Sequence, residues 1–306
     1  MKRKGTGPDG LVVVDKPAGV TSHHVVSRMR RLARTRKVGH AGTLDPMATG
    51  VLIIGVEKAT RLLGHLMLTR KTYEATIRLG QDTVTDDAEG EVTASAGASG
   101  LGREAVEAGC AKLTGDIEQV PSKVSAIKID GKRSYARVRS GEDVELAARP
   151  VTVDSFEVRD VREAVAEDGT AVVDVDAVVE CSSGTYVRAL ARDLGADLGT
   201  GGHLTALRRT RVGPYGLDRA RTLEELEEEF APLGLTEAAV EAFPHWDVPR
   251  DEAKRIANGV RVEAPGMGGT EKEPVAVVSD GQLIALIEER KGKVRTLAVF
   301  VHGSEL

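Results

Sequence analysis

Cysteine and aromatic residues are scarce in this chain of 306 residues, and it contains no long apolar run. Its two cysteines, Cys110 and Cys181, are too few and too far apart to indicate a disulfide framework or a cysteine metal cluster. The longest apolar runs, such as residues 11–14 and 51–54, fall far short of the roughly 20 residues that a membrane helix needs. The basic residues 2–4 are not followed by the apolar segment of a secretory signal. We therefore expect a cytoplasmic protein without a membrane part.

Charge is segregated along the chain, although the net charge of −5 argues against a uniformly basic nucleic-acid binder. Residues 1–40 contain ten basic and two acidic residues, an excess of eight. Further basic clusters lie at 123–139 and 208–211, and acidic residues gather at 86–91 and 224–229. This pattern is typical of a polyanion-binding face on an acidic body. For the run 28–37 taken alone, a solvated helix face is the alternative.

Hydrophobic periodicity predicts a mixture of strands and helices without regular alternation. Such a mixture favours an α+β fold with a mixed, largely antiparallel sheet. Residues 94–102, rich in Gly, Ser and Ala, are expected to form a flexible linker. Strands are expected at 10–15, 51–56, 72–79, 171–181 and 204–212. Helices are expected after Thr21-Ser22, at 103–113, after Thr185 and at 223–230.

The last 60 residues or so have the pattern of a small, mostly β domain. Pro244 and Pro249 bracket the expected boundary between a main domain, 1–247, and a tail, 248–306. A short helix is expected to end near Asn258-Gly259, and Asp280-Gly281 is a strong hairpin signal. The strands expected in the tail are 260–264, 275–279, 282–288 and 294–301.

The segment 39–50 is the best candidate for chemistry. Its three glycines and Pro46 define a tight, non-helical backbone that presents one carboxylate, Asp45, and one imidazole, His40. From residue types alone, Asp45 is more often a turn residue that accepts hydrogen bonds from nearby amides. The order of the surrounding segments favours a functional role.

Seven segments occur in the order of the signatures of the TruB family of tRNA pseudouridine synthases, and the chain resembles that family over residues 10–213. The resemblance implies the pseudouridine synthase fold, an RNA-gripping insertion at about 120–146 and a PUA-like RNA-binding tail. The segments are 10–22 (GLVVVDKPAGVTS), 38–52 (VGHAGTLDPMATGVL), 71–80 (KTYEATIRLG), 83–90 (TVTDDAEG), 125–137 (SAIKIDGKRSYAR), 183–188 (SGTYVR) and 204–209 (LTALRR).

The reaction implied by the resemblance is isomerisation of uridine to pseudouridine at position 55, in the T-loop of tRNA. The glycosidic bond breaks, the base turns and a carbon–carbon bond forms, which needs no redox change, cofactor or metal. A carboxylate nucleophile suffices, attacking either ribose C1′ or base C6. The target base is stacked in a folded loop, so it has to be flipped out. The implied protein is a monomer that needs no protein partner.

The resemblance assigns a role to each candidate site residue. Asp45 is the nucleophile, and Arg188 pairs with it and keeps it ionised. Tyr73 stacks on the target base and is a candidate acceptor of the C5 proton. The remaining expected substrate contacts are His40 on the opened RNA, Tyr186 and Leu207 at the flipped base, and Lys16 at phosphate.

Each assignment competes with an ordinary structural role. Without the motifs, Tyr73 and Tyr186 would be core residues, Arg188 an exposed helical arginine and His40 a turn histidine. His23, His24 and His203 lack the spacing of metal ligands. Two other functions stay open: a guide-RNA-dependent pseudouridine synthase that needs partner proteins, and a tRNA-folding chaperone, which could coexist with catalysis.

Overall fold

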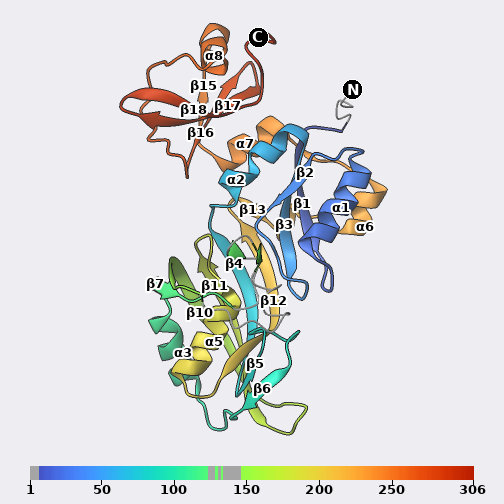
Figure 1. Cartoon of the computed structure of the whole chain (residues 1–306), viewed down its shortest axis with the longest axis vertical. Helices are drawn as coiled ribbons and strands as arrows, with labels where there is room; N and C mark the ends of the chain where they lie inside the picture. The colour runs from blue at the N-terminus through green and yellow to red at the C-terminus, as the bar shows by residue number, and fades with distance from the viewer. Residues whose placement is uncertain (1–6, 123–127, 130–131, 134–145) are drawn as a thin grey trace. The chain divides into compact units, whose positions relative to one another are not determined.

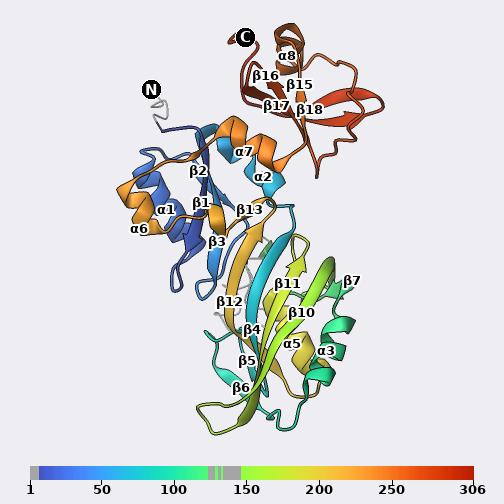
Figure 2. The same ribbon diagram turned by 180° about the vertical axis from the view of Figure 1, so that it is seen from behind.

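The computed structural model describes residues 7–122, 128–129, 132–133 and 146–306 of the chain, so most of the expected RNA-gripping insertion lies outside the described residues. The chain divides into two compact units. Figures 1 and 2 show their helices and strands from two opposite sides. The first unit comprises Met1–Pro46, Gly50–Thr69 and Val212–Leu306, and the second Met47–Thr49 and Arg70–Arg211. No helix of the described part is both long and apolar enough to cross a lipid bilayer.

The first unit is built around the strand that is formed by the start of the family-like segment 10–22. Strand β1 (Gly10–Lys16) pairs antiparallel with β3 (Thr49–Val56), and β2 (Val38–Ala41) also pairs with β3. Helix α1 (Ser22–Leu32) begins after Thr21, whose side chain accepts a hydrogen bond from the His24 amide. The smaller elements of this unit are η1 (Glu57–Arg61), α2 (Leu63–Leu66), β13 (Tyr215–Gly216), η2 (Leu217–Arg219), α6 (Leu223–Glu228), β14 (Leu233–Gly234) and α7 (Leu235–Ala242).

The C-terminal part of the first unit is the expected small β structure. Its sheet has the order β15 (His245–Asp247), β16 (Val275–Ser279), β17 (Gln282–Arg290) and β18 (Lys293–Val299), with α8 (Arg250–Ala257) packed on it. The strand expected at 260–264 is absent from this described region, where Glu263 makes only an isolated bridge. Pro265 and the positive-φ Gly266 directly after it explain the difference.

The core of the first unit combines both ends of the sequence. Leu11 and Val13 of β1 belong to the same buried cluster as Leu283, Leu286 and Phe300. The amide of Leu283 also donates to the hydroxyl of Thr236 in α7, at 2.9 Å. The C-terminal strands therefore complete the core of the N-terminal ones.

The second unit is an antiparallel sheet with two helices on it. The strand order is β12 (Gly202–Val212), β4 (Lys71–Leu79), β11 (Ala171–Cys181), β10 (Arg149–Val165) and β7 (Gly115–Gln119). Helix α3 (Arg103–Lys112) packs on β10, and α5 (Val187–Asp197) packs on β4 and on α3; Figure 1 shows both helices in front of the sheet. The remaining strands are β5 (Gln81–Thr83), β6 (Val92–Ser95), β8 (Lys128–Ile129) and β9 (Lys132–Arg133).

The expected linker at 94–102 is not free of the sheet. The Gly97 amide donates to the Gly80 carbonyl at 3.0 Å, and the Ala98 amide donates to the Ala171 carbonyl at 2.8 Å. Ala98 is almost completely buried. Residues 97 and 98 are thus hydrogen-bonded to the neighbouring backbone at residues 80 and 171, so the prediction of a flexible linker is wrong.

Candidate active site

The loop that carries Asp45 is fixed by Ser22, a buried residue in the first turn of α1. The Ser22 hydroxyl donates to the Leu44 carbonyl at 3.0 Å and accepts from the Leu44 amide at 2.9 Å. Leu44 is itself buried, and it directly precedes the half-buried Asp45. The serine thus fixes both backbone groups of the residue next to the carboxylate.

The other side of Asp45 is fixed through Pro46. Its carbonyl accepts from the Gly19 amide at 2.8 Å and from the Lys16 ammonium at 3.1 Å. Lys16 also donates to the carbonyls of Pro17, at 2.9 Å, and Val20, at 2.8 Å. The first and second family-like segments therefore act together: one holds the backbone of the other on both sides of Asp45.

Lys16 differs from the expectation of a phosphate contact. Its side chain is 0% exposed, and three carbonyl oxygens accept from an ammonium group that has three N–H bonds. An ammonium group so placed has no donor to offer a phosphate. In this structure Lys16 stabilises the Asp45 loop.

His40 lies on β2, five residues before Asp45, opposite Ile54 of β3 and half-buried. The chain turns out of β2 at Gly42, where φ is +77°. A side chain would be strained in this conformation. The glycine is therefore required for the turn that leads from His40 to Asp45.

The second unit carries the other expected site residues. Tyr73 lies on β4, opposite Val179 of β11, and Leu207 lies on the neighbouring strand β12. Tyr73 is 7% exposed and Leu207 is 8% exposed. Tyr186 is the N-cap residue of α5, and Arg188 lies in the first turn of that helix.

Arg188 is held by the loop 83–90. Its side chain is 4% exposed, and its Nη1 donates to the Thr85 carbonyl at 2.7 Å and lies 3.4 Å from Oδ2 of Asp87. Asp87 is 2% exposed. The expected pairing of Arg188 with Asp45 stays a prediction, whereas the pairing of Arg188 with Asp87 was not identified from the sequence.

Residues 83–90 (TVTDDAEG) have the pattern T-x-T-x-D-x-x-G, and its fixed positions hold Asp87 in place. Thr83 donates to the Asp87 carbonyl at 2.8 Å, and the Thr85 hydroxyl donates to Oδ1 of Asp87 at 2.5 Å. The Glu89 amide donates to the same Oδ1 at 3.1 Å. At Gly90 a side chain would collide with Thr85. Each fixed position of the pattern therefore helps to present one carboxylate to Arg188.

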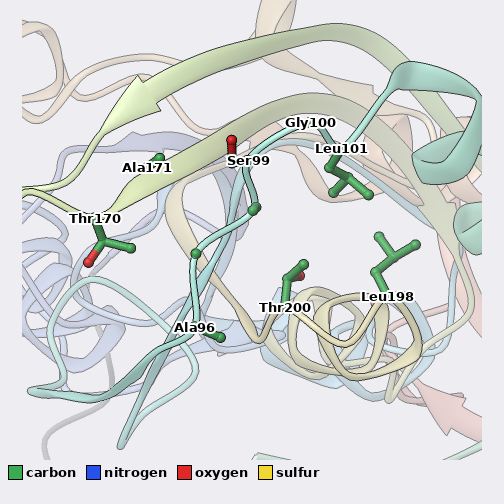
Figure 3. Close-up of a pocket in the computed structure, with 10 residues that line it drawn as sticks. Ala96, Ser99, Gly100, Leu101, Thr170, Ala171, Leu198 and Thr200 are labelled. Atoms are coloured by element: carbon green, nitrogen blue, oxygen red, sulfur yellow. The ribbon is translucent and has the colours of Figure 1, made fainter.

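Neither a metal-ligand cluster nor the pocket shown in Figure 3 involves these residues within the described part of the chain. The part of the chain that the structure describes contains no group of three or more His, Cys, Asp or Glu side chains arranged to hold a metal ion. His203 is buried, with Nδ1 3.0 Å from the Gln81 carbonyl oxygen. A pocket of about 640 Å³ in the second unit (Figure 3) is lined by small and aliphatic residues such as Ser99, Thr170 and Leu198, none of them titratable.

Three family models match this chain between residues 30 and 301. Residues 30–187 match the family described as TruB family pseudouridylate synthase (N terminal domain). Residues 188–239 match the tRNA pseudouridylate synthase B C-terminal domain, and residues 243–301 match tRNA Pseudouridine synthase II, C terminal.

Relatives and solved structures point the same way. Proteins named tRNA pseudouridine synthase B from Streptomyces griseus and Streptomyces coelicolor are 66% and 64% identical, each over 98% of this chain and 100% of the relative. A chain in the structure of an H/ACA RNP bound to a substrate RNA containing 2′-deoxyuridine is 25% identical, with a TM-score of 0.70 over 97% of this chain and 86% of that one. A chain of a Cbf5-Nop10-Gar1 complex gives a TM-score of 0.71, also at 25% identity, over 96% of this chain and 86% of that one. With a family match over more than half of its length and relatives this similar, the chain belongs to the TruB family of pseudouridylate synthases.

Proposed function

We propose that this chain converts uridine to pseudouridine at position 55, in the T-loop of tRNA, with Asp45 as the nucleophile. Isomerisation of a tRNA uridine follows from the family and from the name its relatives share. The observation that supports Asp45 is the rigid backbone on both of its sides, fixed by Ser22 at Leu44 and by Lys16 and Gly19 at Pro46. A nucleophile that has to meet a flipped base needs such preorganisation.

The other site residues have complementary roles in this proposal. Arg188 keeps the nucleophilic carboxylate ionised, because a neighbouring cation favours the charged form. Tyr73 stacks on the target base and is a candidate acceptor of its C5 proton, and Tyr186 and Leu207 contact the flipped base. His40 stacks on the RNA that the base has left. Attack on ribose C1′ and attack on base C6 are both compatible with Asp45.

We further propose that the chain acts alone, as a cytoplasmic monomer without a cofactor. The alternative, a guide-RNA-dependent enzyme, gains some support from the structural neighbours in H/ACA RNP and Cbf5-Nop10-Gar1 complexes. Those neighbours are 25% identical to this chain, whereas the tRNA pseudouridine synthase B relatives reach 66%. The greater similarity favours a tRNA substrate recognised without a guide.

The test is tritium release from a T-arm stem-loop whose uridines carry tritium at C5, incubated with the purified protein and no other component. We expect release by the wild type and none by Asp45→Asn, which keeps the size of the side chain and loses its nucleophilic charge. RNA binding by the variant should be retained. Release only after guide RNA and partner proteins are added would favour the alternative.

A tRNA-folding role is tested with the same Asp45→Asn protein. If the chain is also a chaperone, the variant should still accelerate the folding of a misfolded tRNA. Folding activity without any tritium release by the wild type would make chaperoning the sole function and would contradict the proposal.

A further inference from the structure

The side chain of Gln119 makes two hydrogen bonds to the backbone of Tyr186, the residue at the start of α5, which is the helix that carries Arg188. Gln119 is the last residue of β7, and its side chain is 1% exposed. Its Oε1 accepts from the Tyr186 amide at 2.8 Å, and its Nε2 donates to the Tyr186 carbonyl at 3.1 Å. One side chain therefore pairs with both backbone groups of Tyr186, as a neighbouring β-strand would.

This contact holds the backbone of the N-cap residue of α5. Tyr186 is the N-cap residue of α5, and its own side chain makes no capping hydrogen bond. The Tyr186 carbonyl also accepts from the Leu190 amide at 3.2 Å, the first hydrogen bond of the helix. Gln119 thus fixes the backbone of the residue at which α5 begins. Arg188 follows two residues later, so its position depends on the same anchor.

A second contact ties the same segment to α5 one turn further along. Nη2 of Arg192 donates to the carbonyl of Val120, the residue after Gln119, at 2.7 Å. Nη1 of Arg192 lies 3.3 Å from Asp86, the neighbour of Asp87. Residues 119–120 are therefore joined to the start of α5 and, through Arg192, to the loop that holds Arg188.

We propose that Gln119 is a positioning residue for pseudouridine formation, which holds Tyr186 in the uridine pocket and Arg188 against Asp87 through the backbone of Tyr186. This inference rests on the proposed function of the site. Gln119 touches neither substrate nor reacting atoms in this role. Its removal should therefore slow the chemical step more than it weakens RNA binding.

The first variant is Gln119→Met, which keeps the length of the side chain and loses both hydrogen bonds. We expect the single-turnover rate on the T-arm stem-loop to fall by about 10- to 100-fold, the usual effect of a small misplacement at an active site. The dissociation constant for the RNA should change by less than about threefold. The matched control is Glu118→Gln, an exposed neighbour on β7, which should keep the wild-type rate.

The second variant, Gln119→Glu, separates hydrogen bonding from packing. A protonated carboxyl can accept from the Tyr186 amide and donate to its carbonyl, whereas a carboxylate can only accept. Burial favours the protonated form, and the nearby cations, Arg192 on α5 and Arg149 opposite Gln119 on β10, favour the ionised form. The rate of this variant relative to the wild type should rise as the pH is lowered from about 8 to about 6.

The outcomes distinguish this inference from the function on which it rests. If the wild type releases no tritium, the proposed function fails. If the wild type is active and folded Gln119→Met is equally fast, or loses only RNA affinity, the positioning role is wrong. If Gln119→Met does not fold, Gln119→Glu decides: a relative rate that stays at the wild-type level up to about pH 10, above the pKa of about 8–9 known for buried glutamates, overturns the inference.

Discussion

Asp87 and Arg188 form an ion pair, 3.4 Å between Oδ2 and Nη1, whose two side chains are both almost completely buried. A buried charge without a partner is costly, so each member of this pair depends on the other. The loop 83–90 supplies Asp87 with two further hydrogen bonds that keep it in place. The pair therefore fixes the arginine that we propose to act on Asp45.

Asp87→Asn should impair catalysis more than RNA binding. The amide would face the Arg188 guanidinium with a donor group, so the arginine would move, and we expect turnover to fall by about 100-fold. The free energy of unfolding should fall by about 3 kcal/mol, since one partner of a buried pair is lost. Tritium release and urea unfolding measure the two effects. As a control, Asp174→Asn breaks the Arg78–Asp174 pair of the same unit and should leave the rate unchanged.

Tyr73→Phe separates stacking from proton transfer, because phenylalanine keeps the ring and loses the hydroxyl. If Tyr73 accepts the C5 proton, the variant should bind and flip the uridine but lose about 10²–10⁴-fold in the isomerisation step. Tyr73→Leu should impair flipping as well. Single-turnover conversion and the fluorescence of 2-aminopurine beside the target base report the two steps. A phenylalanine variant with the wild-type rate would leave Tyr73 with a stacking role only.

Lys16→Met distinguishes loop support from phosphate binding. Because Lys16 donates to carbonyls of its own loop, its loss should lower turnover and the melting temperature without changing the salt dependence of RNA binding. Arg36→Gln, at an exposed position of the basic N-terminal segment, should reduce the slope of log affinity against log salt by about 1 if Arg36 contacts phosphate. A reduced slope for Lys16→Met would restore the phosphate contact that the sequence predicts.

Lys71 should make stability depend on pH in the alkaline range. Burial, together with the nearby Arg209, lowers the pKa of Lys71 from 10.5 to about 8. Between these values the unfolded chain binds more protons than the folded one, so the contribution of Lys71 to the free energy of unfolding rises with pH. Urea unfolding of the wild type and Lys71→Met should give a difference that changes by about 2–3 kcal/mol from pH 7 to 10.5.

Two buried cysteines have the opposite effect on the pH dependence of stability, and the comparison of the wild type with Lys71→Met cancels most of it. Burial raises the pKa of Cys110 to about 12 and that of Cys181 to about 11, so both thiols stay protonated in the folded state and reduce stability above pH 9. Both cysteines remain in Lys71→Met. A difference between the two proteins that stays constant with pH would contradict the assignment to Lys71.

Strands rich in valine, such as β1 and β11, could be predicted closely from the sequence, and β10 could not. The expected strands 10–15 and 171–181 correspond to β1 and β11. In β10 the pairing with β11 shifts between Val153 and Ser155 and again between Val158 and Asp160. Such bulges interrupt the alternation of apolar and polar residues from which a strand is recognised.

Motifs name residues of the candidate site, but the sequence does not show the distant contacts that hold these residues in place. Ser22 could be read as part of a helix start, but its hydroxyl binds Leu44, 22 positions away. Asp87 lies in the family-like segment 83–90, and nothing in the sequence of this segment shows that Arg188, 101 positions later, is its partner. Gln119 and Tyr186 are 67 positions apart. These contacts form only when the chain folds, so the local sequence does not indicate them.

The shared core of the two chain ends sets the order in which the protein can fold during synthesis. The second unit is nearly continuous, from Arg70 to Arg211, so it can fold as soon as that stretch has left the ribosome. The first unit cannot complete its core at that stage, because Leu11 and Val13 pack in one cluster with Leu286 and Phe300. The strand that leads to Asp45 must therefore wait for the last residues to be translated. A prematurely terminated chain would keep a folded sheet with Tyr73 and Arg188 and leave the Asp45 half of the enzyme without its core.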